Sequence, residues 1–241
     1  MFKKIAAVFM ICLLGAACIL ENALADRRSY VWTYEYMTMP KGMAEVEYYL
    51  TTQVPDTAKS NVNTWKHQVE LEYGITDHWD ASMYQMWKQE NTASSSTFGY
   101  DGFKIRTRYR FGERGRWFID PEFYFEYIRD DDLSKPHVGE AKLILGRDID
   151  NWNISYNQII ERNLERTGKA EHEYAAGISY EFLPAFKIGI ESKGSYTGHE
   201  YAIGPTASLA TNRFWVSFGA AFGLNDKTDD VQTRMIVGVP F

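Results

Sequence analysis

Residues 231–241 read VQTRMIVGVPF, and this last stretch of the chain decides the fold class. Its side chains alternate between two kinds, as in a β-strand, where successive residues point to opposite faces. The mostly apolar face carries Thr233, Met235, Val237, Val239 and Phe241, and the other carries Gln232, Arg234, Ile236, Gly238 and Pro240. The chain is therefore predicted to end on a strand whose two faces meet different surroundings.

This ending resembles the C-terminal strand of bacterial outer-membrane β-barrels, in which a terminal Phe belongs to the signal that the assembly machinery reads. The resemblance implies an assembly signal at Val237, Val239 and Phe241. It also implies a location in the cell outer membrane of a Gram-negative bacterium. The partners that it implies are the barrel assembly machinery, outer-membrane lipid and lipopolysaccharide.

The first twenty-five residues have the pattern of an export signal. Lys3 and Lys4 precede an apolar run over residues 5–20, and the small residues of the sequence ALA at 23–25 precede Asp26. The run is shorter than the roughly 20 apolar residues that a spanning helix needs. We predict that residues 1–25 are a cleaved signal peptide. A membrane anchor and a lipoprotein attached through Cys18 are the alternatives.

Cysteine content and charge exclude several classes of site. Cys12 and Cys18 both lie in the leader, so the mature chain has no disulfide and no thiolate ligand for a metal. Without residues 1–25, 24 of the 26 basic and 31 of the 32 acidic residues remain, a net charge of about −7 that disfavours nucleic acid as a partner. Phosphate-loop, dinucleotide and zinc motifs are absent from the sequence, and we expect no cofactor and no metal.

After Asp26 the alternation recurs in segments of about 10 to 13 residues, each long enough to cross a bilayer at a tilt. The predicted strands are 43–54, 61–74, 79–89, 101–111, 116–128, 137–148, 152–163, 170–181, 186–196, 201–211, 214–223 and 231–241. Twelve is an even number, as bacterial outer-membrane barrels require. The prediction is an all-β fold, an antiparallel up-and-down transmembrane β-barrel over residues 43–241.

The predicted connections alternate between tight and long. Tight turns fall at 75–78, 112–116, 149–151, 183–185 and 211–213, whereas polar, longer links lie between them, such as 91–99 and 129–136. The strands that follow tight turns open on Trp79, Trp117, Trp152, Phe186 and Phe214. Outer-membrane barrels have short periplasmic turns, longer outer loops and aromatic girdles. We therefore predict that the tight turns and the C-terminus lie on the periplasmic side.

A soluble β-sandwich would alternate in the same way, but its apolar faces would have to form a core. In this chain apolar faces such as Val69 and Leu71 alternate with charged faces such as Glu70 and Glu72. Charges recur on too many strands for a simple solvent face. Aromatic strand ends with aliphatic middles favour lipid as the surroundings.

The sharpest feature of the inward faces is a basic ladder, formed by Lys104, Arg106, Arg108 and Arg110 at every second position of one strand. Like charges stacked in this way repel unless carboxylates oppose them. A tight hairpin at 112–116 would set Arg108 beside Asp120 and Arg106 beside Glu122. The predicted pore-lining residues are Lys104, Arg106, Arg108, Arg110, Asp80, Asp120, Glu122, Glu126, Glu70, Glu72, Glu140, Lys142 and Arg234.

Three functions are compared for this interior. The first is a porin-like channel for passive passage of small polar or charged solutes, with the ladder as its selectivity device. The second is a structural barrel whose salt-bridged lumen conducts nothing. The third is an outer-membrane enzyme, but the barrel phospholipase places a Ser two residues after a His, and none of the five histidines has a Ser there. We therefore predict no enzymatic activity and no catalytic residue, and the solute stays open.

Residues 26–42 are predicted to form a plug in the lumen or a short strand at the periplasmic rim. Tyr30, Trp32 and Tyr34 alternate with other side chains, and residues 39–42 read as a turn. A further transmembrane strand would make the count odd. The acidic loop residues 130–132 and 226–230 are predicted to be solvated or to bind calcium.

Two short motifs also resemble a family. The sequence TMPKG at 38–42 leads into EVE at 45–47, and LEYGITD follows at 71–77. This combination is similar to a broad group of transporter-like outer-membrane barrels that includes proteins labelled as belonging to the MetA pathway of phenol degradation. The resemblance covers about a third of the chain and implies a channel or transporter, without naming a solute.

Overall fold

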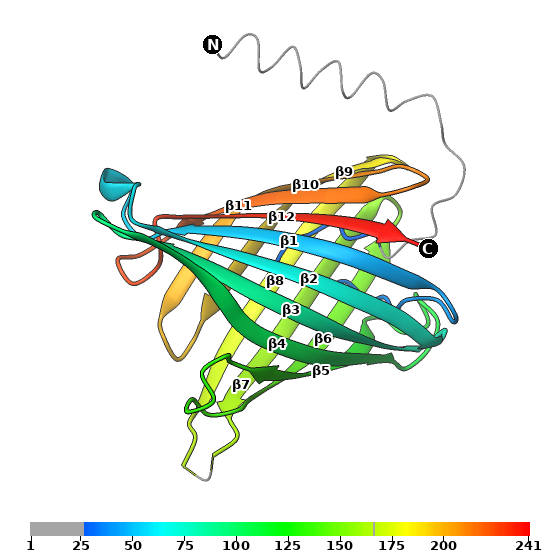
Figure 1. Ribbon diagram of the computed structural model, residues 1–241. Coiled ribbons are helices and arrows are strands. Elements are labelled where there is room, and N and C mark those ends of the chain that lie inside the picture. Colours follow the sequence, from blue (N-terminus) through cyan, green and yellow to red (C-terminus); the bar gives the residue numbers. More distant parts are fainter. Residues whose placement is uncertain (1–26, 166) are drawn as a thin grey trace.

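The computed structural model describes residues 27–165 and 167–241, so the predicted signal peptide lies outside the described residues. In the described part of the chain twelve antiparallel strands form one closed barrel, which β12 closes by pairing with β1 (Figure 1). The strands are β1 (Ala44–Val54), β2 (Asn63–Thr76), β3 (Trp79–Asn91), β4 (Ser96–Arg110), β5 (Asp120–Arg129), β6 (Val138–Ile149), β7 (Trp152–Asn163), β8 (Ala170–Leu183), β9 (Phe186–Ser195), β10 (Glu200–Ala210), β11 (Trp215–Gly223) and β12 (Val231–Pro240). A single 3-10 turn, η2 (Thr57–Lys59), lies between β1 and β2 among the described residues. No helix in these two ranges is long and apolar enough to cross a membrane.

The predicted fold class and strand number are confirmed, and the main errors lie at one hairpin. β4 begins at Ser96 and β5 begins at Asp120, so the connection predicted as a tight turn spans residues 111–119. Asp120 accepts hydrogen bonds from the backbone N–H groups of Gly115 and Trp117, which closes a turn before the strand starts. Trp117 therefore precedes its strand and does not open it, and Phe214 likewise precedes β11.

The two rims of the barrel differ in their connections. The C-terminal rim, defined here by Phe241, carries residues 77–78, 111–119, 150–151, 184–185 and 211–214. The distal rim carries residues 55–62, 92–95, 130–137, 164–169, 196–199 and 224–230. In Figure 1 the C-terminus lies at one end of the barrel and η2 at the other. All connections at the C-terminal rim are short except 111–119, as the alternation of turn lengths predicts.

The barrel reverses the burial pattern of a soluble protein. On β2 the apolar Val69, Leu71 and Tyr73 are exposed, whereas Glu70 and Glu72 between them are buried. The same reversal holds around the wall, where the outward side chains include Met83, Ile105, Phe123, Phe125, Ile154, Ile178, Ile190, Phe218 and Val239. An apolar surface of this size around a polar interior is stable in lipid and not in water. This excludes the sandwich alternative.

The last residue of the chain takes part in closing the barrel. The Phe241 N–H donates to the Ala44 carbonyl at 2.9 Å, and the Ala44 N–H donates back to the Phe241 carbonyl at 3.2 Å. The side chains of Val239 and Phe241 are exposed on the outer wall. Val237 shares their face of β12, so the predicted assembly signal is presented to the surroundings of the barrel, and its reading by the assembly machinery stays a prediction.

Replacing Ile190 with Arg tests the assignment of the outer wall to lipid. Ile190 lies in the middle of β9 with 53% of its surface exposed. Arg at this depth in a lipid-facing wall is expected to lower the free energy of unfolding by about 2–4 kcal/mol, measured by urea titration in lipid vesicles. Leu133→Arg is the control, because Leu133 is 78% exposed in a distal loop. Equal stability of the two variants would contradict the assignment.

Candidate functional site

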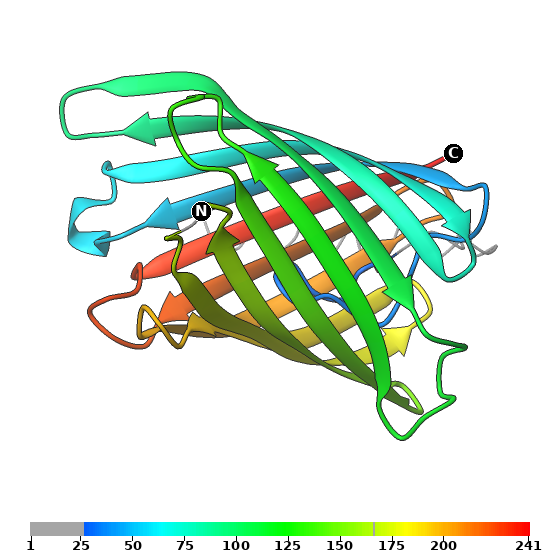
Figure 2. The same cartoon turned by 90° about the horizontal axis from the view of Figure 1, so that it is seen from below.

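The interior of the barrel holds residues 27–43, which are called the luminal segment below. Arg27 donates a hydrogen bond to the carbonyl of Pro184, and the Lys41 N–H donates to Asp77 Oδ1 at 3.1 Å. Both acceptors belong to turns of the C-terminal rim, so the segment enters and leaves at the same end. Figure 2 shows it in blue inside the barrel. Nearly all of its residues from Arg28 to Met39 are buried, and it contains no strand.

A single glutamate binds the innermost part of the luminal segment. Glu191 of β9 accepts hydrogen bonds from the backbone N–H groups of Val31, Trp32 and Thr33, each at 2.8 Å. Hydrogen bonds to a charged carboxylate are stronger than those between neutral groups. The carboxylate therefore replaces the strand partner that this irregular stretch of backbone lacks.

Side chains of three further strands accept hydrogen bonds from backbone N–H groups between Tyr34 and Met39. Asn157 of β7 accepts from the Tyr34 N–H at 2.6 Å and donates to the Tyr34 carbonyl at 2.9 Å. Glu122 accepts from the Met37 N–H at 2.8 Å, and Asp80 accepts from the Met39 N–H at 3.0 Å. These contacts satisfy buried backbone groups from the barrel wall. The predicted pore-lining residues Glu122 and Asp80 thus hold the luminal segment.

Two glycines of the wall make room for the luminal segment. An added Cβ at Gly177 of β8 would lie 2.4 Å from the ring of Tyr30, and one at Gly219 of β11 would lie 2.5 Å from Val31. Real Cβ atoms do not approach other atoms so closely. A larger residue at either position would push the segment away from the wall.

A buried ion network lies beside the segment and uses the central part of the basic ladder. Arg106 Nη2 lies 2.9 Å from Glu70 and 2.7 Å from Glu72. Arg108 Nη2 lies 2.8 Å from Asp80 and also pairs with Glu72. Arg106 and Arg108 are 2% and 1% exposed. Their partners come from β2 and β3, so faces of three neighbouring strands, β2, β3 and β4, pack as one charged cluster.

The register predicted for the basic ladder is wrong. Arg106 lies opposite Glu126, Arg108 opposite Tyr124, and Arg110 opposite Glu122. The pairing is shifted by four residues along β5 from the predicted partners because the connection at 111–119 is longer than a tight turn. The principal carboxylates of the network therefore come from β2 and β3, not from β5.

The remaining ladder residues lie at the two ends of the network. Lys104 pairs with Glu126 at 2.9 Å on the distal side. Arg110 lies near the C-terminal rim, where its Nε donates to Thr38 Oγ1 at 2.9 Å and its Nη2 to the Asp77 carbonyl at 2.7 Å. Asp120 closes the adjoining turn, as described above. The ladder thus divides into one residue on the distal side, two buried residues and one residue that binds the luminal segment.

Two polar cavities lie on either side of the luminal segment. The vestibule, on the distal side, has a volume of about 260 Å³, and Trp32 and Tyr34 of the segment line it. Of the predicted pore-lining residues, those that border the vestibule are Lys104, Glu126, Glu140, Lys142 and Arg234. The second cavity, of about 180 Å³, is lined by Glu35, Arg114, Asp148, Glu181 and Lys187 near the C-terminal rim.

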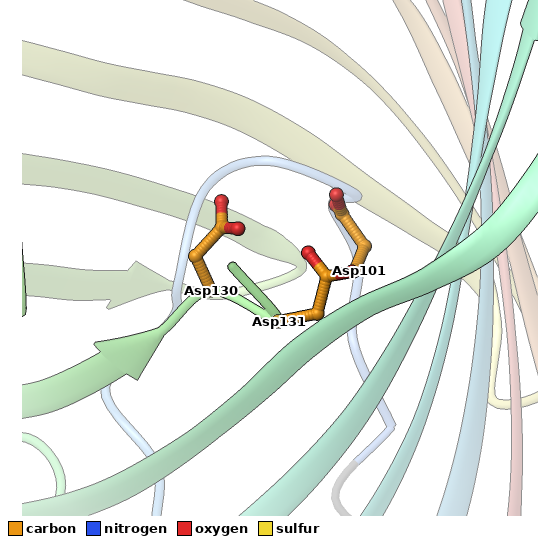
Figure 3. Close-up of side chains that lie close together, drawn as sticks. All are labelled: Asp101, Asp130 and Asp131. Carbon is orange, nitrogen blue, oxygen red and sulfur yellow. The ribbon is translucent and has the colours of Figure 1, made fainter. Parts of the chain in front are cut away.

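Three carboxylates gather at the distal rim, those of Asp101, Asp130 and Asp131 (Figure 3). Lysines lie beside two of them: Lys88 is 3.3 Å from Asp101, and Lys135 is 2.8 Å from Asp130. Although partial burial would raise it, hydrogen bonds from Lys135 and from the backbone of Asp132 lower the pKa of Asp130 below its ordinary value. Calcium binding by the loop at 130–132 stays a prediction.

Replacing Arg106 with Met tests whether the network is structural. The change leaves Glu70 and Glu72 buried beside an uncharged side chain, which is expected to lower the free energy of unfolding by about 3–5 kcal/mol. The measurement is urea unfolding in lipid vesicles. Arg213→Met is the control, since Arg213 is exposed in the turn at 211–214. A fully stable Arg106→Met barrel would contradict a structural network.

Replacing Gly177 with Leu tests whether the close contact between Gly177 and the ring of Tyr30 holds the luminal segment in place. The new side chain is expected to displace the luminal segment while the wall stays paired, so trypsin should cleave after Arg28 several times faster than in the unsubstituted protein. Cleavage is followed by mass spectrometry. Gly99→Leu is the matched control, because nothing lies within 4 Å of an added Cβ at Gly99. Equal rates of cleavage after Arg28 in the two variants would contradict a role of this contact in holding the segment.

Comparisons with known proteins show the fold of the chain. No protein-family model matches the chain, and no curated protein matches it in sequence. Among solved structures it is similar to the COG4313 outer membrane channel from Pseudomonas putida F1, with a TM-score of 0.65, 8% identity, and coverage of 88% of this chain and 100% of the other. It is also similar to the KdgM porin in complex with disordered oligogalacturonate, at a TM-score of 0.57 and 14% identity over 82% of this chain and 98% of that one. The NanC porin gives a TM-score of 0.51 and 13% identity over the same shares. The chain therefore has the fold of outer-membrane β-barrels.

Proposed function

We propose that this protein is a porin-like channel of the outer membrane for small polar or charged solutes, and that the luminal segment forms its constriction. The observation that carries the proposal is the pair of polar cavities, one on each side of residues 27–43. Each is lined by ionisable side chains that water and ions would solvate. A lumen used only as a scaffold would not need charged cavities at both ends.

The orientation follows from the connections. In bacterial outer-membrane barrels the short turns face the periplasm and the longer loops face outward. On this rule the C-terminal rim is periplasmic, the vestibule opens to the exterior, and the luminal segment is inserted from the periplasmic side. Solutes would then meet Lys104, Lys142 and Arg234, with the glutamates opposite them, before they reach the constriction.

The similar structures support a channel as the kind of function. They are an outer membrane channel and two porins, one of them in complex with oligogalacturonate. The solutes of these proteins are not transferred to the present chain, because its sequence identity to them is between 8% and 14%. Membership in the group that includes the MetA-pathway proteins stays a hypothesis that rests on the motifs at 38–47 and 71–77. A channel of this kind needs no catalytic residue.

A structural barrel is the second candidate, and one observation favours it. Arg106 and Arg108 are almost fully buried and bind carboxylates, not solvent. Neutralising them would then affect folding and not ion selectivity. The two candidates differ in whether current passes when the luminal segment is absent.

Deleting residues 27–42 tests the channel and its constriction together. The refolded chain from residue 26, with and without this deletion, is placed in a planar bilayer and its single-channel current is recorded. The deletion is expected to raise the conductance several-fold, because it removes the residues between the two cavities. Both barrels should stay heat-modifiable on gels.

A milder variant keeps the test independent of the deletion. Glu191→Gln keeps the shape of the side chain but loses the charge that binds three backbone N–H groups. It is expected to add brief, larger openings to the current. Lys169→Gln, at an exposed position of a distal loop, is the control. Folded barrels that stay silent in every form would reject the channel and favour the structural candidate.

A further inference from the structure

A row of glutamates crosses four neighbouring strands near the distal rim. Glu126 of β5 lies opposite Glu140 of β6, Glu140 opposite Glu161 of β7, and Glu161 opposite Glu171 of β8. Like charges directly opposite on paired strands destabilise a sheet. Lys104 and Lys142 each bind one of the first two at 2.9 Å. Within the described ranges no ion pair reaches Glu161 or Glu171.

A group of bases without carboxylate partners lies on other strands at the same end of the barrel. The basic group consists of Lys66, Lys193 and Arg234. Lys66 and Arg234 both lie opposite Thr51 of β1, on either side of it. The charged ends of Lys193 and Arg234 lie 5.3 and 5.7 Å from the ring of Trp32. In the described part of the chain no carboxylate is within 4 Å of any of the three.

Some members of both sets border the vestibule. Lys193 and Arg234 line the vestibule together with Glu126, Glu140 and Glu173. Glu173 lies two residues beyond Glu171 on the same face of β8 and has no ion pair among the described residues. Lys66 lines an adjoining cavity of about 360 Å³, which shares Gln68 and Lys104 with the vestibule.

Unpaired donors in the vestibule also point to a ligand. Trp32 and Tyr84 line it with 8% and 2% of their surfaces exposed. The indole Nε1 of Trp32 and the hydroxyl of Tyr84 have no hydrogen-bond partner among the described residues. Buried polar groups are normally satisfied, so donors left over beside a polar cavity indicate a bound molecule or water.

The bases of this group come from β2, β9 and β12 and the glutamates from β5 to β8, and the two sets meet where β8 pairs with β9, at Glu173 and Lys193. A simple anion would be attracted by one side and repelled by the other, and so would a simple cation. We propose that the vestibule binds a small zwitterionic solute, with its carboxylate at Lys193 and Arg234 and its ammonium at Glu173. This deepens the proposed function and rests on it for transport, whereas binding can be measured whether or not the barrel conducts.

The test is isothermal titration calorimetry on the folded chain from residue 26 in detergent. The probes are glycine, 4-aminobutyrate and 6-aminohexanoate, which differ in the distance between their charges, together with butyrate and butylamine, which each carry one charge. At least one zwitterion is expected to bind about tenfold or more tightly than both single-charge probes. Binding of butyrate or butylamine at least as tight as that of every zwitterion would overturn the proposal, and so would the absence of any binding.

Two substitutions assign the ends of the ligand. Lys193→Gln is expected to lower the affinity for the zwitterion and for butyrate about tenfold and to leave the affinity for butylamine unchanged. Glu173→Gln is expected to lower the affinity for the zwitterion and for butylamine and to leave that for butyrate unchanged. Lys169→Gln serves again as the control. Unchanged zwitterion binding in both variants would overturn the assignment. If a variant does not fold, the comparison of probes on the unsubstituted protein decides alone, and a silent barrel that binds the zwitterion would reject the channel while supporting this site.

Discussion

Hydrogen bonds from the backbone of the luminal segment to carboxylates of the wall organise the interior of this barrel. A segment without strand pairing carries buried N–H groups that need acceptors. Asp80, Glu122 and Glu191 supply them from three different strands. The interior therefore contains carboxylates that bind the luminal segment as well as carboxylates that pair with its arginines. Arg106 and Arg108 then offset the repulsion where those acids crowd together.

This arrangement separates two roles that a charged lumen can have. Near the C-terminal rim the charges are buried, bonded to one another or to the luminal segment, and act on stability. Toward the distal rim Lys193 and Glu173 face a cavity and have no ion-pair partner among the described residues. Arg234 lines the same cavity and donates to the Val31 carbonyl and to Thr51, without a carboxylate partner in that part of the chain. The boundary between the two regions is Trp32 and Tyr34, at the inner end of the segment. The charge of a side chain does not show whether it stabilises the barrel or faces the cavity. Its position along the barrel axis, relative to Trp32 and Tyr34, distinguishes the two roles.

The sequence could predict the architecture because period-two alternation is local and repeats twelve times. It could not predict the β4–β5 register, since a four-residue difference in the length of one connection moves every cross-strand pair. It identified Arg106 and Arg108 as inward-facing but not as buried, because the segment that covers them is far away in the chain. Gly177, Gly219 and Asn157 carry no local signal at all. Their roles follow from contacts with residues 30–34, which only the folded barrel brings near.

The position of both ends of the luminal segment at one rim has a consequence for assembly. Arg27 lies at the turn after β8, and Gly42 donates a hydrogen bond to the carbonyl of Gly74 next to the turn after β2. A chain that enters and leaves a ring on the same side is not threaded through it. The wall can therefore close first, along the seam between Ala44 and Phe241, and the segment can fold into the finished ring afterwards as a doubled-back loop. Topology thus leaves the order of these two events free.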